Sequence, residues 1–175
     1  MIKTRNAGLM LTAAALLLAA AACGYRLRGT GTSLPAGIKS VSVPVFKNLS
    51  GRYELDVKLT RAVIDELVGR GRLRLEADAS RADALLEGVC VSFAAVPTAF
   101  TAQGRPDRYN ITVTANARLR ARESGSVIFA AEGFKFIEEY EVPEGADFES
   151  VQTEAIDRIA PKFARSLVAA MLEGF

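Results

Sequence analysis

One segment constrains the fold of this chain more than any other, the stretch "RYNITVTANARLRAR" at residues 108–122. Its side chains alternate between apolar and polar along the whole stretch. The apolar positions are Tyr109, Ile111, Val113, Ala115, Ala117, Leu119 and Ala121. The polar positions that follow them are Asn110, Thr112, Thr114, Asn116, Arg118, Arg120 and Arg122. Because successive side chains of a β-strand point to opposite faces, this pattern predicts a long strand of an antiparallel sheet with one face on a core and the other open.

Two neighbouring segments, 82–96 and 126–142, predict further long strands. The turn "ESGS" with Gly125 joins the last strand to 108–122. In 126–142 the apolar positions change from odd to even numbers, so we expect a β-bulge near Gly133.

Earlier in the chain, residues 38–46 alternate, with Val41, Val43 and Val45 on one face, which predicts a strand. Pro44 favours an edge position or an irregularity there, because proline cannot donate to a sheet ladder. A shorter strand is expected at residues 72–76.

Two segments have helical periodicity. Residues 48–72 carry a stripe at four-residue spacing, formed by Leu55, Leu59, Val63 and Leu67 and widened by Val57, Ile64 and Val68. Residues 147–175 form a second amphipathic segment, in which Asp147 is a plausible N-cap and Pro161 should kink or split the helix. The element order βαββββα predicts an α+β fold, a mixed four- to five-stranded sheet with two helices packed on one face.

The amino-terminal segment has the anatomy of a signal peptide. Lys3 and Arg5 precede the apolar run 9–22, which is shorter than the about 20 residues of a membrane-spanning helix. The run ends in "AAAC", which resembles a bacterial lipobox and implies cleavage before Cys23 and acylation of that cysteine, with palmitate among its chains. Gly24 follows where an inner-membrane retention signal would have Asp, so the resemblance implies the outer membrane. We therefore expect a signal peptide at 1–22, an acylated terminus and linker at 23–37, and one domain at 38–175.

Composition excludes several classes of function. The sequence has 22 Lys and Arg residues and 20 Asp and Glu residues, and two of the basic ones lie in the signal segment, so bulk charge gives no support to nucleic-acid binding. The absence of histidine removes the commonest general base and most zinc sites, and no metal-ligand spacing or other cofactor motif is present. Cys90 lies inside the apolar run "LLEGVCVSF" and should be buried, on the same face as Gly88, Ser92 and Ala94.

Several stretches together resemble the lipopolysaccharide-assembly lipoprotein family (LptE type). They are "CGYRLRG", "LPAGIKSVSVPVFKN", "LTRAVIDEL", "ADALLEG", "RYNITVTANARL" and "RIAPKFARSLV", in that order along the chain. The resemblance implies a non-enzymatic outer-membrane lipoprotein on the periplasmic side of a Gram-negative envelope. It also implies that the chain plugs and helps assemble a large β-barrel translocon of the LptD type, and that it binds lipopolysaccharide.

The "ADALLEG" stretch is also similar to outer-membrane lipoproteins that activate peptidoglycan synthases or serve other secretion and assembly complexes. A regulator of an inner-membrane enzyme is therefore the alternative. This alternative is disfavoured because the tether between Cys23 and the first strand has only about 14 residues and reaches roughly 50 Å. That reach is short for a protein anchored in the outer membrane that must contact an enzyme of the inner membrane.

The polar positions of 108–122 suit a wall that faces a polar barrel lumen, so we expect Thr112, Thr114, Asn116, Arg118 and Arg120 to face the partner. An ordinary solvated sheet face is the alternative.

Lipopolysaccharide contact requires cations placed to meet phosphates. The strand-connecting loop at 97–110 is the region that the resemblance ties to this role, and Arg105 and Arg108 are its candidate cations, with no nearby excess of acid in sequence.

Lys135 on the adjoining strand is a weaker candidate for the same contact.

Four glutamates in "FIEEYEVPEG" raise the possibility of a hydrolase, but Glu138 and Glu139 are adjacent on a strand and must point to opposite faces. The sequence therefore favours a binding and assembly protein over an enzyme.

Overall fold

A computed structural model of the chain describes residues 34–173. Cys23 and the predicted signal peptide lie outside these residues. The elements are β1 (Ser40–Ser42), β2 (Lys47–Asn48), α2 (Leu55–Arg70), β3 (Arg74–Leu75), β4 (Ala84–Phe100), β5 (Pro106–Ala121), β6 (Val127–Glu141) and α3 (Phe148–Glu173). The α+β fold is confirmed.

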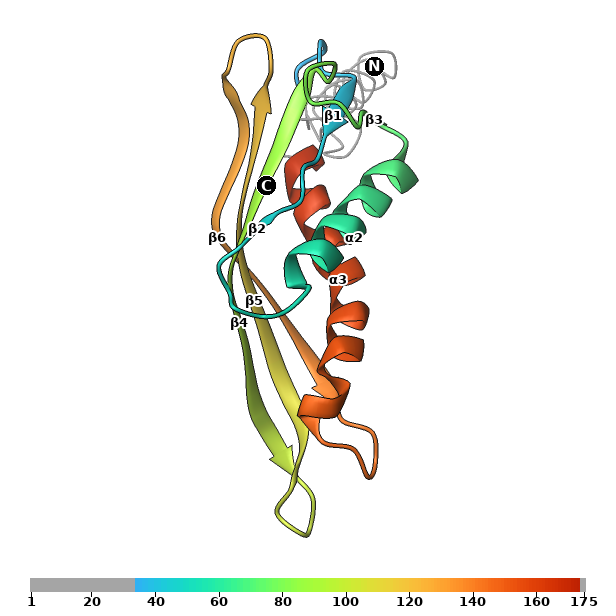
Figure 1. Cartoon of the computed structure of the whole chain (residues 1–175), viewed down its shortest axis with the longest axis vertical. Helices are drawn as coiled ribbons and strands as arrows, with labels where there is room; N and C mark the ends of the chain where they lie inside the picture. Colours follow the sequence, from blue (N-terminus) through green and yellow to red (C-terminus); the bar gives the residue numbers. More distant parts are fainter. Residues whose placement is uncertain (1–33, 174–175) are drawn as a thin grey trace, which may run out of the picture. The chain divides into compact units, whose positions relative to one another are not determined.

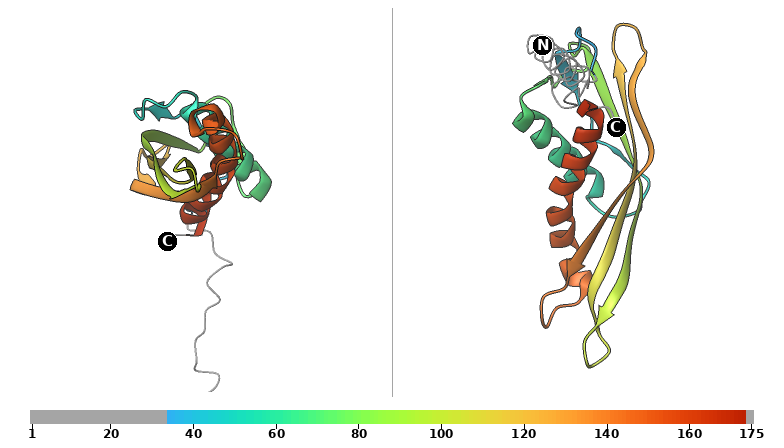
Figure 2. Two further views of the ribbon diagram at one scale, coloured as in Figure 1. Left: turned by 90° about the horizontal axis from the view of Figure 1, so that it is seen from below. Right: turned by 180° about the vertical axis from the view of Figure 1, so that it is seen from behind.

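All strands belong to one mixed sheet in the order β3-β1-β4-β5-β6, and the short β2 also pairs with β4. β1 runs parallel to both β3 and β4, as the strand-helix-strand crossover predicts, whereas β4, β5 and β6 form a long antiparallel meander. Both helices lie on the same face of this sheet, and the opposite face carries no helix (Figures 1 and 2). The predicted architecture is therefore confirmed.

The predicted strand at 38–46 is interrupted in the structure. β1 ends at Ser42 and β2 begins only at Lys47, with Pro44 in the gap. The expectation that Val45 shares a face with Val41 is wrong, because Val41 is fully buried and Val45 is 62% exposed. Pro44 offers no N–H to a ladder, so the chain leaves the sheet and rejoins it on β4.

α2 packs through one stripe. Leu55, Leu59, Val63 and Leu67 are buried, and Gly71 ends the helix with a φ of 62°. The prediction that Val57 and Val68 widen this stripe is wrong, because both are more than half exposed on the outer flank of the helix.

Two bulges set which side chains face the core. The pairing of β5 with β6 is interrupted near Gly133: Ala115 of β5 lies opposite Phe134, but Ala117 lies opposite Ala131, so β6 has one extra residue there. Gly133 has a φ of 62°, which confirms the predicted bulge. A second bulge, not foreseen, lies at Val91 in β4. It moves Ser92, Ala94 and Val96 to the helix-free face of the sheet, so the shared face predicted for Cys90, Ser92 and Ala94 is wrong.

α3 is a single continuous helix that begins after Asp147, whose Oδ1 accepts a hydrogen bond of 2.8 Å from Ser150 N. The N-cap is confirmed. Pro161 lies inside the helix without splitting it. Its side chain is exposed on the flank away from the sheet.

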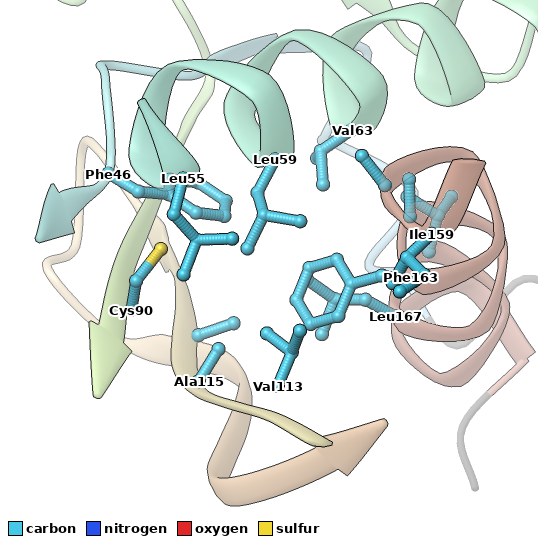
Figure 3. Close-up of a cluster of buried hydrophobic side chains, with 14 of the residues drawn as sticks. Phe46, Leu55, Leu59, Val63, Cys90, Val113, Ala115, Ile159, Phe163 and Leu167 are labelled. Atoms are coloured by element: carbon cyan, nitrogen blue, oxygen red, sulfur yellow. The ribbon is translucent and has the colours of Figure 1, made fainter. Parts of the chain in front are cut away.

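The core fills the space between the helices and the inner face of the sheet (Figure 3). Phe46 is 2% exposed and lies over Gly88, where an added Cβ would be 2.4 Å from the ring. Cys90 is fully buried beside it, as predicted. In the "ADALLEG" stretch Ala82, Ala84 and Leu86 are buried, whereas Leu85 lies opposite Arg120 on the other face of the sheet. Gly88 makes room for the ring of Phe46.

Candidate functional site

The candidate site is the helix-free face of the meander, called the open face. Its central strand is β5, and the five predicted polar residues of that strand are half-buried on this face: Thr112, Thr114, Asn116, Arg118 and Arg120. Their neighbours in β5 point into the core, where Ile111, Val113 and Leu119 are fully buried. The alternation of the sequence is thus reproduced side chain by side chain.

One half of the open face is organised by ion pairs that cross the strands. Arg118 donates to Glu132 of β6 at 3.0 Å, and Arg120 donates to Glu87 of β4 at 3.2 Å. Between them lies a depression of about 270 Å³, lined by Glu87, Val89, Asn116, Ala117, Arg118 and Glu132. All four charged groups remain 40–74% exposed, so the pairs order this surface without contributing much to stability.

Asn116 has a structural task on the same face. Its Oδ1 accepts a hydrogen bond of 2.7 Å from Gly133 N, at the bulge of β6. This contact fixes the register of the last strand relative to β5.

The other half of the open face is more apolar. Val96 of β4 and Ile137 of β6 flank β5 there and are 58% and 59% exposed. The open face therefore carries two ion pairs at one end, and at the other end it carries exposed aliphatic groups together with the ion pair Arg108–Glu139.

The region predicted as a loop at 97–110 is mostly strand. β4 continues to Phe100 and β5 starts at Pro106, so only residues 101–105 form the turn. Gly104 has a φ of 75°, and the turn is closed by a hydrogen bond of 2.8 Å from Thr101 N to Arg105 O. Phe100 is 58% exposed. We call residues 97–108 the distal hairpin.

The three predicted cations are not grouped. Arg105 is exposed at the turn and forms no ion pair with any residue of 34–173. Arg108 lies 3.6 Å from Glu139 and opposite Glu141, so the fold places acidic residues beside it although the sequence around it has no excess of acid. Lys135 is opposite Thr114, six residues along the strand from Arg108 and thus about 20 Å away. Arg105 is the one of the three placed to meet an external anion on the distal hairpin.

The glutamates of β6 are engaged in surface contacts. Glu138 pairs with Lys162 of α3, and Glu139 with Arg108.

Burial raises the pKa of the Cys90 thiol to about 12, and the charge of Asp56 adds to the rise. Within residues 34–173 there is no group of acidic or sulfur ligands suited to a metal ion. Neither α2 nor α3 is long and apolar enough to span a membrane.

The model of the lipopolysaccharide-assembly family LptE matches residues 38–171. The chain belongs to this family. Family membership makes it a non-enzymatic lipopolysaccharide-assembly lipoprotein, as the sequence resemblance implied. The matched range covers every strand and nearly all of α3, so the open face and the distal hairpin are parts of the family domain.

Solved structures with a similar fold include the hypothetical protein CT253 from Chlamydia trachomatis. It is 12% identical, with a TM-score of 0.54, and the match covers 79% of this chain and 97% of that chain. Rare lipoprotein B from Shewanella oneidensis is 13% identical, with a TM-score of 0.42 over 74% and 95% of the two chains. Lipoprotein B from Nitrosomonas europaea is 16% identical, with a TM-score of 0.44 over 83% and 91%. No curated protein matches the chain significantly.

Reasoning from the sequence missed the acidic residues of the open face. Glu87 and Glu132 come from the strands on either side of β5, and cross-strand pairing is not visible along one strand. A partial signal was present for Glu87, because Leu86 and Gly88 alternate inward on either side of it.

Proposed function

We propose that this chain is an outer-membrane lipoprotein, anchored through acylated Cys23, that plugs a large β-barrel lipopolysaccharide translocon of the LptD type and helps it assemble. In this proposal residues 1–22 are the signal peptide, 23–37 the acylated terminus and linker, and 38–175 the assembly domain. The observation that carries it is the open face, a long polar surface without a covering helix on a domain of the lipopolysaccharide-assembly family.

The chemistry of the open face supports docking against a barrel wall. The lumen of a membrane barrel is polar, because lipid-facing and lumen-facing residues alternate along its strands. Threonine, asparagine and arginine side chains on β5 can exchange hydrogen bonds with such a wall. The exposed ends of the pairs Arg118–Glu132 and Arg120–Glu87 can do the same, and they keep the surface ordered before docking.

Lipopolysaccharide contact is assigned in this proposal to the distal hairpin. Arg105 lies at the turn and has no ion partner within residues 34–173, and Phe100 of the same hairpin has an exposed ring. A guanidinium binds phosphate through forked hydrogen bonds, and an aromatic ring can contact acyl chains. Arg108 and Lys135 are secondary candidates, because Glu139 already neutralises the first and the second lies far along the sheet.

Affinity capture of the tagged full-length chain from detergent-solubilised outer membranes tests the partner. We expect to recover one barrel protein at equal stoichiometry, and we expect the Cys23→Ala chain no longer to fractionate with the outer membrane.

The double variant Arg118→Glu/Arg120→Glu should reduce barrel recovery. Arg61→Glu is the matched control, because Arg61 is an exposed arginine on the helix side with one weak contact to Asp65. Recovery of a peptidoglycan synthase instead of a barrel would overturn the proposal.

Binding of purified lipopolysaccharide tests the distal hairpin separately. Arg105→Glu should weaken binding several-fold, whereas Arg72→Glu, an exposed arginine before β3, should leave it unchanged. Equal binding by both variants would remove the distal hairpin from the proposal and leave the barrel contact untouched.

A further inference from the structure

A basic flank of α3 runs beside the last strand of the sheet. Arg158, Lys162 and Arg165 are exposed and lie at i, i+4 and i+7, which places them on one side of the helix. Lys162 pairs with Glu138 of β6, and the Arg158 guanidinium lies 5.2 Å from the centre of the Tyr140 ring. The side of α3 that borders β6 is therefore the basic one, and the second half of β6 lies beside the first half of α3 in Figures 1 and 2.

Two of these three cations have no acidic partner. Arg158 and Arg165 form no ion pair with any residue of 34–173, and Lys162 is paired with Glu138. Glu154, one helical turn before Arg158, is exposed and does not neutralise it, because the guanidinium turns toward β6. The basic flank thus has positive charge to offer to an external anion.

The strand beside this flank has a free edge. β6 ends the sheet order and, among residues 34–173, pairs with β5 alone. After the bulge at Gly133 its pairing with β5 is regular from Phe134 to Glu141. We call residues 134–141 the edge segment. A regular strand with an unpaired edge presents a row of backbone N–H and C=O groups to which another extended chain can add.

The hydrogen-bond pattern identifies the free backbone groups. Val142 N donates to Asp107 O at 2.8 Å, so residue 142 directs its backbone groups toward β5. Alternate residues of an antiparallel strand bond to the same neighbour, so the even positions of the edge segment also face β5. The N–H and C=O groups of Lys135, Ile137 and Glu139 therefore point away from the sheet. Pairing through them uses no side chain of the open face.

The helix side of the edge segment is incompletely covered. Phe134 and Phe136 meet Phe163 of α3 edge-on, with ring centroids 5.7 Å and 6.3 Å away, yet both remain partly exposed. A further strand would lie about 4.8 Å beyond β6. Because Lys162 already reaches β6, the arginine side chains of the same flank come within reach of carboxylates on that further strand.

We propose that an extended acidic segment of a partner protein adds to the free edge of β6, antiparallel to it, with its carboxylates turned toward the basic flank of α3. The outward N–H and C=O groups of Lys135, Ile137 and Glu139 supply the backbone hydrogen bonds. Arg158 and Arg165 select the charge, because hydrogen bonds from a guanidinium to a carboxylate are among the strong ones. The contact leaves the open face free for its own partner, so it does not depend on a barrel.

A fluorescein-labelled peptide of alternating Glu and Thr residues is the probe. Its fluorescence anisotropy is measured with the full-length chain in a neutral detergent. Residues directly opposite in an antiparallel ladder share a face, so the threonine N–H groups point at β6 when the carboxylates face the basic flank. N-methylation of the threonines should therefore abolish binding, whereas N-methylation of the glutamates should change it little. A peptide with Lys in place of Glu should bind far more weakly.

Matched variants of the chain test the same contact from the other side. Arg158→Gln/Arg165→Gln should weaken binding of the Glu-Thr peptide at least several-fold. Arg61→Gln/Arg72→Gln removes the same charge from exposed arginines elsewhere and should not. Ile137→Pro removes one outward N–H and leaves the ladder to β5 in place, so it should weaken binding, whereas Ile137→Ala should not.

Three results would each overturn the proposal. Binding that survives N-methylation of the threonines would show attraction of charges without strand pairing. Equal binding of the Glu and Lys peptides, or an equal effect of the two arginine double variants, would remove the basic flank from the contact. Absence of any binding by the native chain would remove the edge segment as well. The N-methylated peptides are tested on the native chain, so their result stands even if Ile137→Pro fails to fold.

Discussion

At the scale of single residues, Gly88 is the glycine whose lack of a side chain the core requires, because the ring of Phe46 lies over it. A methyl group at Gly88 would lie 2.4 Å from the ring, so Gly88→Ala must displace Phe46 from the core. We expect a loss of about 1–3 kcal/mol in the free energy of unfolding, the usual cost of overpacking. Urea unfolding of the non-acylated chain measures it.

Gly69→Ala is the control for that experiment. Gly69 lies in α2 with no atom within 4 Å of an added Cβ, so alanine should stabilise the helix by up to about 1 kcal/mol. Equal effects of the two substitutions would contradict the packing described for Phe46.

Asp83 makes stability depend on pH. Hydrogen bonds from the Ser40 hydroxyl and from Lys39 N lower the pKa of this carboxyl below 3.8. Because the folded pKa is depressed, the stabilisation is present above the unfolded value of about 3.9 and is lost as pH falls through the folded value. The difference in urea midpoint between the native chain and Asp83→Asn should therefore be largest near neutral pH and shrink below pH 4.

A matched substitution checks the assignment. Asp65→Asn removes an exposed carboxylate that forms only a weak pair with Arg61 at 3.6 Å. The urea midpoint of Asp65→Asn should differ little from that of the native chain at every pH. If the difference in urea midpoint between Asp83→Asn and the native chain did not change with pH, the stabilising role of the Asp83 charge would be contradicted.

Cys90 should be inert in the folded chain. Its thiol is fully buried, and with a pKa of about 12 only about one molecule in ten thousand carries the thiolate at pH 8. Alkylation of Cys23→Ala at pH 8 should be negligible until urea unfolds the chain. Rapid labelling without urea would mean that the core around Phe46 opens readily.

At the scale of elements, periodicity predicted the three long strands and both helices because each buries one face. The alternation of 108–122 was sufficient to place Thr112 and Arg118 on the open face. The change of parity in 126–142 located the bulge at Gly133, whose positive φ suits glycine. The bulge at Val91 was not predictable, because "VCVSFAAV" contains no glycine and small or apolar residues fit either face.

The contacts between strands could not be predicted from one sequence. Arg108 is preceded by Asp107 in the sequence, but its ion pair is with Glu139, which reaches it only through the pairing of β5 with β6. In the same way, a helix stripe could not reveal that Val57 and Val68 stay outside the core, because that depends on how α2 meets α3.

Pro161 offers a test at this scale. Proline has no N–H, so the i→i−4 hydrogen bond to Asp157 O is lost inside a continuous α3. Pro161→Ala should restore it and raise the free energy of unfolding by about 1–3 kcal/mol in urea titrations. Glu154→Ala, an exposed substitution in the same helix, should change stability by less than about 0.5 kcal/mol. A destabilised Pro161→Ala chain would show that the proline makes a favourable contact on its flank.

At the scale of the whole molecule, the fold separates a packing face from a docking face. The helices cover one side of the meander, and the other side presents the polar row of β5. Two ion pairs lie at one end of this row, and exposed aliphatic groups lie with the pair Arg108–Glu139 at the other. Family membership connects this domain to lipopolysaccharide assembly. The proposed functions of the open face and the distal hairpin can be tested on different residues and can fail independently.

The central claim is that the open face contacts the wall of a barrel. Its most direct test is a photo-crosslinking amino acid at Thr114 in the full-length chain, irradiated in cells, with Arg61 on α2 as the comparison position. The account predicts a strong adduct with one outer-membrane barrel protein from position 114 and a weaker one from position 61. Co-purification of the barrel without any adduct from position 114 would contradict it.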